Sequence, residues 1–434
     1  MKTVYGLSLG CKENTYETAA VLSAFEKEGY QILQSKNADA DVYVLSTCAV
    51  TATGEQKCRQ VLHGLRRDHP NAVICAMGCY TQVCDDPAAV FADADIVVGV
   101  KHRTKLPALV ESFLAQNKQI VLIGDNRHLP YETMSADFLP GHDRAVIKIG
   151  EGCNQYCTYC IIPFARGNPR SRPIEDIREE AVRFAQNGYK ELVVSATNLS
   201  LYGKDLKEDV SMVDALQAMS VDGIERIRLG SLEPRFLLDV VKKGLCKVPK
   251  LCPHFHVSLQ SGSDTVLARM KRHYTQDDVW QVISAIRAEL PDATFSADII
   301  CGFPGETEQE AKETFDFAKK VGFLHIHAFP YSPREGTVAA KMEGQLSGSV
   351  KAARVRALTE LNKETEAQMI EKMIGKRVCV LIEGKPKTHK GESYAFGFTE
   401  NYVKVLLDKK FVEKKGELVC VDIKSAAEGF LFAK

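Results

Sequence analysis

The sequence predicts an α/β protein of several domains. Short apolar runs alternate with amphipathic helical patterns from the N-terminus to about residue 350, which is typical of parallel sheets with crossover helices. Beyond that point short strand patterns follow one another with only turn residues between them. We therefore expect an N-terminal parallel α/β domain (1–135), a central open (β/α)6 barrel (139–370) and a C-terminal small antiparallel β-barrel (372–434).

The composition excludes a protein with a strong overall charge or a membrane-spanning segment. Lys plus Arg equals Asp plus Glu at 56 each, so any site for a polyanion must be a local patch. No apolar run approaches the length needed to cross a bilayer, so we expect no membrane partner. The chain starts without a signal-peptide pattern and holds 14 cysteines. We expect a cytoplasmic protein whose thiols are metal ligands or core residues rather than disulfides.

Three predicted strands of the N-terminal block each end just before a cysteine. The strands span 4–9, 42–46 and 73–77, and the cysteines are Cys11, Cys48 and Cys79. Because ligands of parallel sheets bind at the carboxyl ends of the strands, these three thiols can converge there. The other cysteines of this block lie inside a strand or in helix-like or polar surroundings, and we expect them to be structural; they are Cys58, Cys75 and Cys84.

The central block, which follows a Pro- and Gly-containing linker at 136–143, repeats a strand–helix unit six times. Right-handed crossovers curl such a series toward a barrel, and six units leave it open. The predicted strands are Ala145–Ile149, Glu191–Ala196, Arg226–Gly230, His254–Leu259, Thr294–Cys301 and Leu324–Phe329. Polar clusters follow five of these strands, at 197–198, 231–234, 260–263, 302–306 and 330–334, where barrels of this kind place their active sites.

The first of these strands leads into a compact cysteine motif. Cys153, Cys157 and Cys160 have the spacing CxxxCxxC, and three thiolates this close can hold one iron–sulfur cluster. A closed electron-transfer cluster or a tetrahedral zinc site needs a fourth ligand, and neither Cys nor His follows nearby. An incomplete ligand set leaves one iron open to a small molecule. The alternative is three unrelated thiols on one loop.

The CxxxCxxC motif resembles the signature of radical S-adenosylmethionine enzymes. The resemblance implies a 4Fe-4S cluster whose open iron binds S-adenosylmethionine and whose electron generates a 5′-deoxyadenosyl radical. A small redox protein such as flavodoxin or ferredoxin is then the expected electron donor. Tyr159 lies between two of the cysteines and is a candidate to contact the adenine. Asn198, Gln260 and Asp298, at or near strand ends, are the other candidate contacts of S-adenosylmethionine.

Over its whole length the chain resembles the radical S-adenosylmethionine methylthiotransferase family. The matching segments are Leu9–Asn14, Ser46–Thr51, Gly78–Tyr80, Glu151–Pro163, Gln260–Ser263 and Cys301–Thr307. The resemblance implies a second 4Fe-4S cluster, held by Cys11, Cys48 and Cys79, and an OB-like RNA-binding barrel, the TRAM domain, at the C-terminus. Two segments depart from the family pattern, Ser195–Asn198 and Gly230–Glu233, and this puts the contacts of S-adenosylmethionine there in doubt.

The resemblance is strongest to the branch that makes 2-methylthio-N-threonylcarbamoyladenosine in tRNA. It rests on residues 161–167, 329–332 and 396–405, the last including Asn401 and Lys404. Residues 372–434 carry 13 Lys and Arg against 8 Asp and Glu, a net charge of +5 in a neutral chain. A basic, aromatic-dotted small barrel favours nucleic acid. We expect the anticodon loop of tRNA as partner, no DNA, and Arg166 and Arg170 as the side chains that bind the threonyl carboxylate.

Three alternatives stay open from the sequence. The first is a methylthiotransferase that acts on a ribosomal-protein aspartate, although the basic third domain disfavours a cationic partner. The second is a sibling enzyme that acts on isopentenyladenosine in tRNA. The third is a non-enzymatic iron–sulfur protein that binds RNA, for which the polar strand ends of the barrel would have no purpose.

Overall fold

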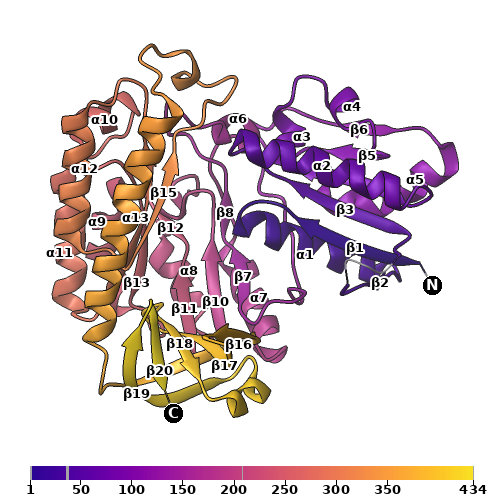
Figure 1. Cartoon of the computed structure of the whole chain (residues 1–434). Helices are drawn as coiled ribbons and strands as arrows, with labels where there is room; N and C mark the ends of the chain where they lie inside the picture. The colour runs from indigo at the N-terminus through magenta and orange to yellow at the C-terminus, as the bar shows by residue number, and fades with distance from the viewer. Residues whose placement is uncertain (1, 36–38, 208, 434) are drawn as a thin grey trace.

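The computed structural model describes residues 2–35, 39–207 and 209–433 and folds them into three parts (Figure 1). The N-terminal part is a six-stranded parallel sheet in the order β2-β1-β3-β4-β5-β6. Its strands are β1 Thr3–Ser8, β2 Gln31–Ile32, β3 Val42–Thr47, β4 Val73–Gly78, β5 Ile96–Val98 and β6 Ile120–Leu122. Its helices are α1 Lys12–Lys27, α2 Ala52–Asp68, α3 Cys79–Val83, α4 Pro87–Val90 and α5 Leu106–Gln116. The predicted parallel α/β fold is confirmed here.

The central part holds two parallel sheets, one of three strands and one of four. Their orders are β7-β10-β11 and β12-β13-β14-β15. The strands are β7 Ala145–Lys148, β10 Glu191–Ser195, β11 Arg226–Leu229, β12 Ser231–Leu232, β13 His254–Gln260, β14 Thr294–Cys301 and β15 His325–Pro330. The helices lie outside the strands (Figure 1); they are α7 Ile174–Gln186, α8 Met212–Ala218, α9 Pro234–Lys242, α10 Asp264–Arg269, α11 Gln276–Glu289, α12 Glu308–Val321 and α13 Gly348–Glu371. Every strand expected in this block is present.

Gly230 separates β11 from β12 and marks the break between the two sheets. Its amide donates a hydrogen bond of 2.8 Å to the Val194 carbonyl. A Cβ atom at this position would lie 2.7 Å from the same oxygen, closer than any side chain tolerates. The glycine that departs from the family pattern is therefore required by the close approach of β10.

The C-terminal part is a closed barrel in the order β16-β17-β18-β20-β19. The strands are β16 Arg377–His389, β17 Glu392–Thr399, β18 Lys404–Leu407, β19 Leu418–Ala427 and β20 Phe430–Ala433. The pair β18–β20 is parallel, so this barrel is not wholly antiparallel as expected. The last strand, β20, follows the turn residues Glu428 and Gly429 and closes the barrel by pairing with both β18 and β19.

One cysteine pair contradicts the expectation that no thiol forms a disulfide. Cys379 and Cys420 are bonded to each other. They stand directly opposite in the antiparallel pair of β16 and β19, which brings their side chains into contact. Composition alone could not reveal this pairing, because it depends on strand register.

The C-terminal barrel closes the amino ends of the central strands. Arg226 donates to the carbonyls of Cys379 and Phe398 at 2.6 and 3.2 Å, and Arg228 donates to that of Glu400 at 2.9 Å. Both arginines also face the fully buried Glu191, whose Oε1 lies 2.6 Å from the Arg228 Nε atom. The Tyr402 ring lies tilted against the His254 ring, 4.9 Å between centroids, and Arg228 lies over the face of the Tyr402 ring. Buried charges thus join the second and third parts.

The segment expected to be a linker is irregular, but it is packed rather than free. Ala136 and Leu139 are buried, and the Ala136 amide donates 2.8 Å to Glu180 on α7. Glu180 also accepts a hydrogen bond from Tyr16 on α1 at 2.9 Å. The N-terminal domain is therefore fixed to the barrel through this segment. Across the ranges that the structure describes, no helix is both long and apolar enough to cross a membrane.

The substitution Glu191→Gln tests the buried charges between the central strands and the C-terminal barrel. The substitution keeps the shape but leaves Arg226 and Arg228 buried without their anion, which costs about 3 to 5 kcal/mol in comparable cases. We expect the free energy of unfolding in urea to fall by that order, with the C-terminal barrel released first in limited proteolysis. Exposed Glu413→Gln is the matched control. Equal stability of the two variants would show that this interface does not depend on Glu191.

Candidate functional site

The CxxxCxxC segment forms a loop between β8 (Gly150–Glu151) and α6 (Ile162–Arg166). Gly152 has φ +83°, and a Cβ there would lie 2.0 Å from the Asn168 carbonyl oxygen, so only glycine fits. Backbone hydrogen bonds from Cys153 to Gly167 (2.9 Å) and from Cys160 to Cys157 (3.0 Å) hold the loop. The other two thiols of the loop lie near Cys160, whose pKa is raised chiefly by burial and further by Cys157 and Cys153.

The N-terminal triplet is assembled from three loops at the carboxyl edge of the sheet. Cys11 caps α1, Cys48 follows β3, and Cys79 opens α3 directly after β4. A Cβ on Gly10 would lie 3.1 Å from the Cys48 sulfur, so the first two loops touch. Asn14 joins them as well, since its Nδ2 donates to the carbonyls of Leu9 and Thr47. Cys79 is near both, since it acts electrostatically on Cys11 and is itself affected by Cys48.

Protein surrounds thiols in both triplets, although Cys11 keeps exposed surface. Burial raises the pKa of Cys11 and Cys160 to about 12 and that of Cys153 to about 11. Such thiols lose their protons readily only when a cation replaces them. Among the described residues, no three Cys, His, Asp or Glu side chains lie close enough to hold a single metal ion. An iron–sulfur cube separates its cysteines more widely than one ion does, because iron and sulfide lie between them, so this finding speaks only about a single-ion site.

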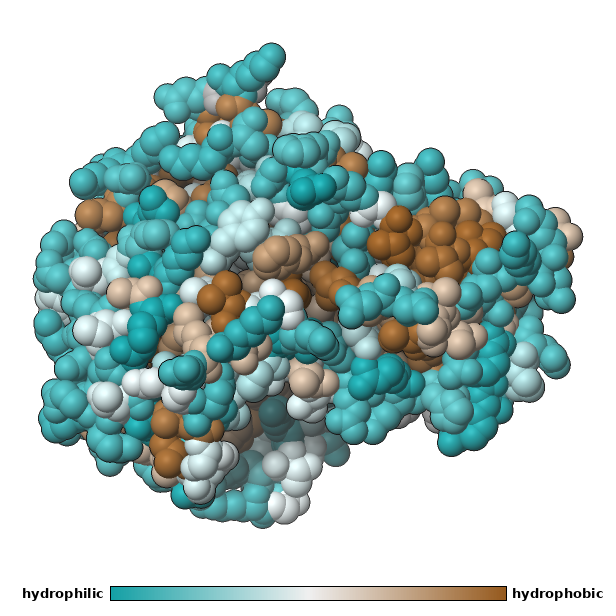
Figure 2. All heavy atoms as spheres, turned by 90° about the horizontal axis from the view of Figure 1, so that it is seen from above, coloured by the Kyte–Doolittle hydropathy of each residue, from teal (hydrophilic) through white to brown (hydrophobic). Residues whose placement is uncertain are grey.

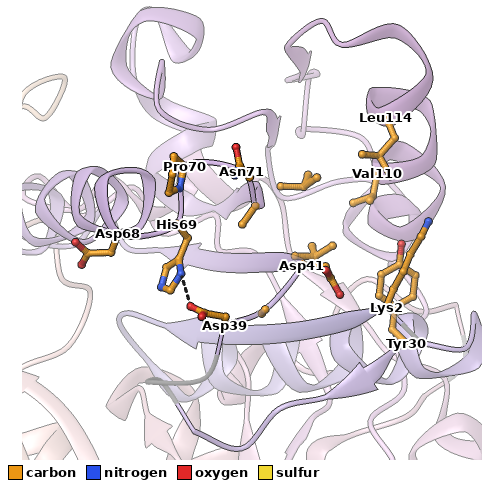
Figure 3. Close-up of a pocket in the computed structure, with 14 residues that line it drawn as sticks. Lys2, Tyr30, Asp39, Asp41, Asp68, His69, Pro70, Asn71, Val110 and Leu114 are labelled. Carbon is orange, nitrogen blue, oxygen red and sulfur yellow. Dashed lines mark ion pairs between the residues drawn. The ribbon is translucent and has the colours of Figure 1, made fainter.

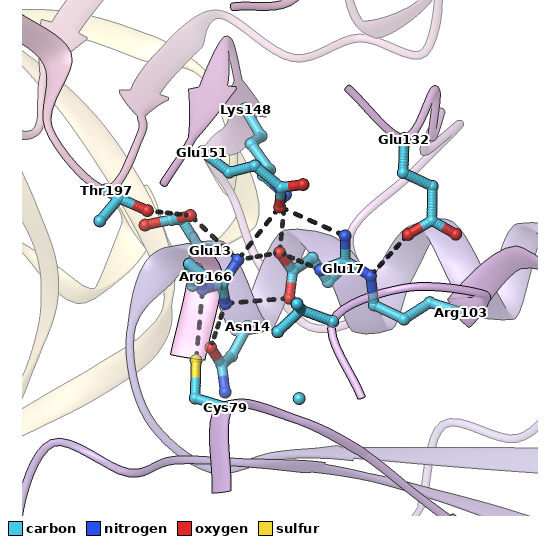
Figure 4. Close-up of polar contacts among 12 residues, drawn as sticks. Glu13, Asn14, Glu17, Cys79, Arg103, Glu132, Lys148, Glu151, Arg166 and Thr197 are labelled. Carbon is cyan, nitrogen blue, oxygen red and sulfur yellow. Dashed lines mark hydrogen bonds and ion pairs between the residues drawn. The ribbon is translucent and has the colours of Figure 1, made fainter. Parts of the chain in front are cut away.

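Arg166 connects the two triplets. It ends α6, which begins two residues after Cys160, and its Nε donates 3.2 Å to the Cys79 sulfur (Figure 4). Its Nη1 faces Glu13 at 3.1 Å and also contacts Glu17, both on α1. Because Arg166 and its partners are buried, the arginine fixes one triplet relative to the other.

Arg166 belongs to a buried network of four cations and four carboxylates, most of them drawn in Figure 4. The members are Arg103, Lys148, Arg166, Arg170, Glu13, Glu17, Glu132 and Glu151. Burial raises the pKa of Glu17, but Arg103, Arg166 and Lys148 outweigh it and hold that pKa below its ordinary value. The hypothesis that Arg166 and Arg170 bind a substrate carboxylate is therefore wrong, since Glu13, Glu17 and Glu151 already occupy both guanidinium groups.

Arg272 contacts a cysteine sulfur of the CxxxCxxC triplet, as Arg166 does for the N-terminal triplet. Its Nη1 donates 3.4 Å to the Cys157 sulfur, and its Nε donates 3.0 Å to the Tyr274 hydroxyl. The tyrosine in turn donates to the carbonyls of Ser258 and Leu259 at the end of β13. Neither arginine has a spacing signal in the sequence, because both reach their thiols through the tertiary fold.

The four candidate contacts of S-adenosylmethionine lie at the barrel end of this region and stay predictions. Tyr159 is half-buried against Phe303, 6.5 Å between ring centroids. Gln260 ends β13 with φ +65°, a strained conformation that is frequent at functional sites. Asn198 donates to the buried Glu233 and accepts from the Ser200 amide at 3.1 Å. Asp298 accepts a hydrogen bond of 3.0 Å from His256.

Polar side chains lie on the inner face of β13–β15. His256, Asp298 and His327 alternate with core residues along their strands and face inward, with Asp298 opposite His327 in register. Lys12, at the start of α1, has exposed surface, and desolvation by the surrounding protein lowers its pKa.

A separate pocket of about 510 Å³ lies at the opposite, amino edge of the N-terminal sheet (Figure 3). Its polar groups are engaged with protein partners: His69 pairs with Asp39 at 3.0 Å, Lys2 with Glu111 at 2.6 Å, and Asp41 accepts from Thr3. The pocket holds none of the expected site residues.

Comparisons with known proteins agree with this geometry. Residues 147–318 match the radical SAM superfamily, and residues 3–99 match an uncharacterized protein family, UPF0004. The threonylcarbamoyladenosine tRNA methylthiotransferase MtaB of Bacillus subtilis is 37% identical over 429 residues, 98% of this chain and 94% of that protein. The protein of the same name from Thermotoga maritima is 36% identical over 99% of this chain and 96% of its own length. This chain belongs to the radical S-adenosylmethionine tRNA methylthiotransferase family.

The chain is also similar to an enzyme named for a different tRNA substrate and to a solved structure at low sequence identity. A tRNA-2-methylthio-N(6)-dimethylallyladenosine synthase of Clostridium botulinum is 34% identical over 95% of this chain and 92% of its own length. The radical S-adenosylmethionine methyltransferase TsrM of Kitasatospora setae has the same fold, with a TM-score of 0.58 at 14% identity over 78% of this chain and 77% of that one. As a radical S-adenosylmethionine tRNA methylthiotransferase, the chain is an enzyme with S-adenosylmethionine and 4Fe-4S clusters as cofactors.

Arg166→Lys tests the link between the triplets. A lysine keeps the positive charge but cannot reach the Cys79 sulfur and both glutamates at once. We expect the reconstituted variant to lose iron from the N-terminal triplet, about half of the total, while the CxxxCxxC loop keeps its cluster signal in electron paramagnetic resonance. Exposed Arg235→Lys, at the Gln155 side chain, is the control. Full iron content in Arg166→Lys would show that Cys79 does not need this hydrogen bond.

Proposed function

We propose that this tRNA methylthiotransferase inserts a methylthio group at carbon-2 of threonylcarbamoyladenosine beside the anticodon. The observation that carries the proposal is the hydrogen bond to the Cys79 sulfur from Arg166, which stands on the helix that follows the CxxxCxxC loop. The substrate is supported by identities of 37% and 36% to two threonylcarbamoyladenosine enzymes, against 34% to the dimethylallyladenosine synthase; a third threonylcarbamoyladenosine enzyme, from Aquifex aeolicus, is also 34% identical. Dimethylallyladenosine in tRNA is the second candidate substrate.

In this proposal Cys153, Cys157 and Cys160 hold one 4Fe-4S cluster, and Cys11, Cys48 and Cys79 hold the other. The first cluster, with S-adenosylmethionine, supplies the radical chemistry that an unactivated aromatic C–H bond requires. Arg272 and Arg166 donate to one thiolate of each set and stabilise its negative charge. Tyr159, Asn198, Gln260 and Asp298 orient S-adenosylmethionine at the strand ends.

The upper face of the molecule offers a surface for the RNA loop. Figure 2 shows apolar side chains near the middle of this face and a larger apolar patch over the N-terminal domain, within a mostly hydrophilic surface. Tyr156, inside the CxxxCxxC motif, and Phe164, on the helix that follows it, are exposed and contact each other edge to face, 5.8 Å between ring centroids. Exposed aromatic rings stack on unpaired bases, as in other proteins that bind single strands. We propose that bases flanking the target stack here.

The third domain, which we propose is a TRAM domain, adds positive charge on its exposed strands and turns. Lys387 lies over the Phe396 ring at 4.7 Å, a combination suited to RNA. Asn401 and Lys404 serve the domain interface instead: the Asn401 carbonyl accepts from Thr294, and Lys404 pairs with Glu366 on α13. We further propose a cytoplasmic setting, with flavodoxin or ferredoxin as electron donor.

The ligand assignment is tested by iron content. Protein reconstituted without oxygen should bind about eight irons, and changing Cys153, Cys157 and Cys160 together to Ala should leave about half and abolish cleavage of S-adenosylmethionine. Cys11→Ala should spare cleavage to 5′-deoxyadenosine yet abolish methylthiolation. Cys84→Ala, outside both triplets, is the control. About four irons in the unmodified protein would exclude a second cluster.

The substrate is tested by mass spectrometry of nucleosides from reacted RNA. Anticodon stem-loops with threonylcarbamoyladenosine should be methylthiolated, because the site must satisfy a polar substituent, and those with dimethylallyladenosine should not. Unmodified adenosine in the same stem-loop is the control. Equal turnover of the two modified RNAs would assign the chain to the second candidate substrate.

The RNA surface is tested by salt dependence. Each lost lysine–phosphate contact should reduce the slope of log Kd against log salt by about 0.7 to 0.9. Weaker RNA binding with a shallower slope is expected on changing four exposed lysines to Gln: Lys385, Lys387, Lys409 and Lys410. Lys57→Gln and Lys319→Gln, exposed on the other two domains, should leave the slope unchanged. An unaltered slope in the fourfold variant would remove this domain from the RNA interface.

A further inference from the structure

The loop that carries Cys48 lies outside the buried ion network. That network holds α1 and reaches Cys79 through Arg166. None of its members belongs to the segment that runs from Cys48 into the first turn of α2. Cys48 is partly exposed, and Val50 and Thr51 behind it are exposed. Because exposed loops are more mobile than the elements that they connect, the position of Cys48 needs a further contact.

Arg334 of the barrel supplies that contact. Its Nη2 atom pairs with the carboxylate of Glu55, on the first turn of α2, and both side chains are largely buried. An ion pair shielded from water is little weakened by salt. Gly54, the residue before Glu55, packs against the cysteine loop, since a Cβ atom there would lie 4.0 Å from the Cys48 Cβ. Within the described ranges, no other ion pair joins α2 to the barrel.

The segment that carries Arg334 follows β15 and is fastened to the CxxxCxxC loop. The Ala339 amide donates a hydrogen bond of 2.8 Å to the carbonyl of Thr158, inside the cysteine motif. The Arg334 carbonyl accepts hydrogen bonds from the amide and the hydroxyl of the buried Thr337, at 3.1 and 2.6 Å. The backbone of the arginine is therefore held in place, and Arg334 connects the motif loop with the loop of Cys48.

We propose that Arg334 is a positioning residue for methylthiolation, which acts through Glu55 to hold Cys48 in its place relative to the CxxxCxxC loop. The inference rests on the proposed function, because it takes Cys48 as a ligand of the N-terminal cluster. Arg166 and Arg334 then fix that triplet at two points, at Cys79 and beside Cys48. Cleavage of S-adenosylmethionine needs only the CxxxCxxC triplet and should not depend on Arg334. Methylthiolation uses both triplets, and a misplacement of about 1 Å can slow such a step roughly 100-fold.

The experiment exchanges the charges of the pair. The reconstituted full chain is compared as wild type, Arg334→Glu, Glu55→Arg and the double variant that carries both changes. Arg67→Glu, at an exposed arginine of the same helix, is the matched control. The RNA is the modified anticodon stem-loop that the wild type methylthiolates. Iron content, KM for the RNA, the rate of 5′-deoxyadenosine formation and the number of methylthio groups formed per 5′-deoxyadenosine are measured.

The number of methylthio groups per 5′-deoxyadenosine should fall roughly 10- to 100-fold in each single variant, while iron content, KM and the rate of cleavage stay close to the wild type. The double variant should recover most of this ratio, because it restores the ion pair with reversed polarity. Arg67→Glu should keep the full ratio.

An unchanged ratio in the single variants would overturn the inference, and so would a double variant that recovers nothing, since a general loss of stability is not repaired by exchanging the charges. Loss of iron from the N-terminal triplet in Arg334→Glu would also overturn it. Arg334 would then be needed to assemble the ligand set rather than to place it.

Hydrogen exchange followed by mass spectrometry measures the link without RNA. The amides of residues 48–58 should exchange faster in Arg334→Glu than in the wild type and the double variant, because the loop has lost its contact with the barrel. If Arg334→Glu does not fold, Glu55→Gln, which keeps the shape of the side chain, decides by the same measurements. Equal exchange in Glu55→Gln and the wild type would overturn the inference. Failure of the proposed function gives a different result, because the wild type would then methylthiolate neither modified RNA.

Discussion

The arrangement of this enzyme depends on the buried ion network between α1 and the barrel. Desolvating eight charged groups is unfavourable unless every one is paired, and here four cations meet four carboxylates contributed by both domains. Neither domain can satisfy its half alone: Arg166 of the barrel needs Glu13 and Glu17 of α1. The network therefore selects one docking geometry, and with it the placement of Cys79 relative to the CxxxCxxC loop.

This constraint explains why the two thiol triplets can cooperate although they arise in separate folds. Each triplet is positioned locally by its own strand ends, as parallel sheets dictate. Their mutual placement comes from Arg166, which belongs to the motif helix of one domain and touches a thiol of the other. Arg272 shows that the same device, an arginine at a cysteine sulfur, also serves the second triplet.

The features that could be predicted from the sequence are those that depend on short-range patterns of residues. Strand ends followed by a cysteine, as after Ser46 and Met77, predicted three of the proposed cluster ligands, and the CxxxCxxC spacing predicted the other three. The roles of Arg166 and Arg272 could not be predicted in this way, because both reach their cysteine sulfurs only through the tertiary fold. The disulfide of Cys379 and the packed segment around Ala136 were missed for the same reason, since register and interdomain packing are not local properties.

The contact between the C-terminal barrel and the amino ends of the central strands has a consequence for chimeric enzymes. Exchanging this barrel between relatives at the end of α13 would separate Tyr402 and the backbone carbonyls of residues 398–400 from Arg226 and Arg228. The recipient would then carry arginines matched to a surface it no longer has. The transferable unit is thus discontinuous in sequence, comprising the barrel together with the first residues of β10 and β11.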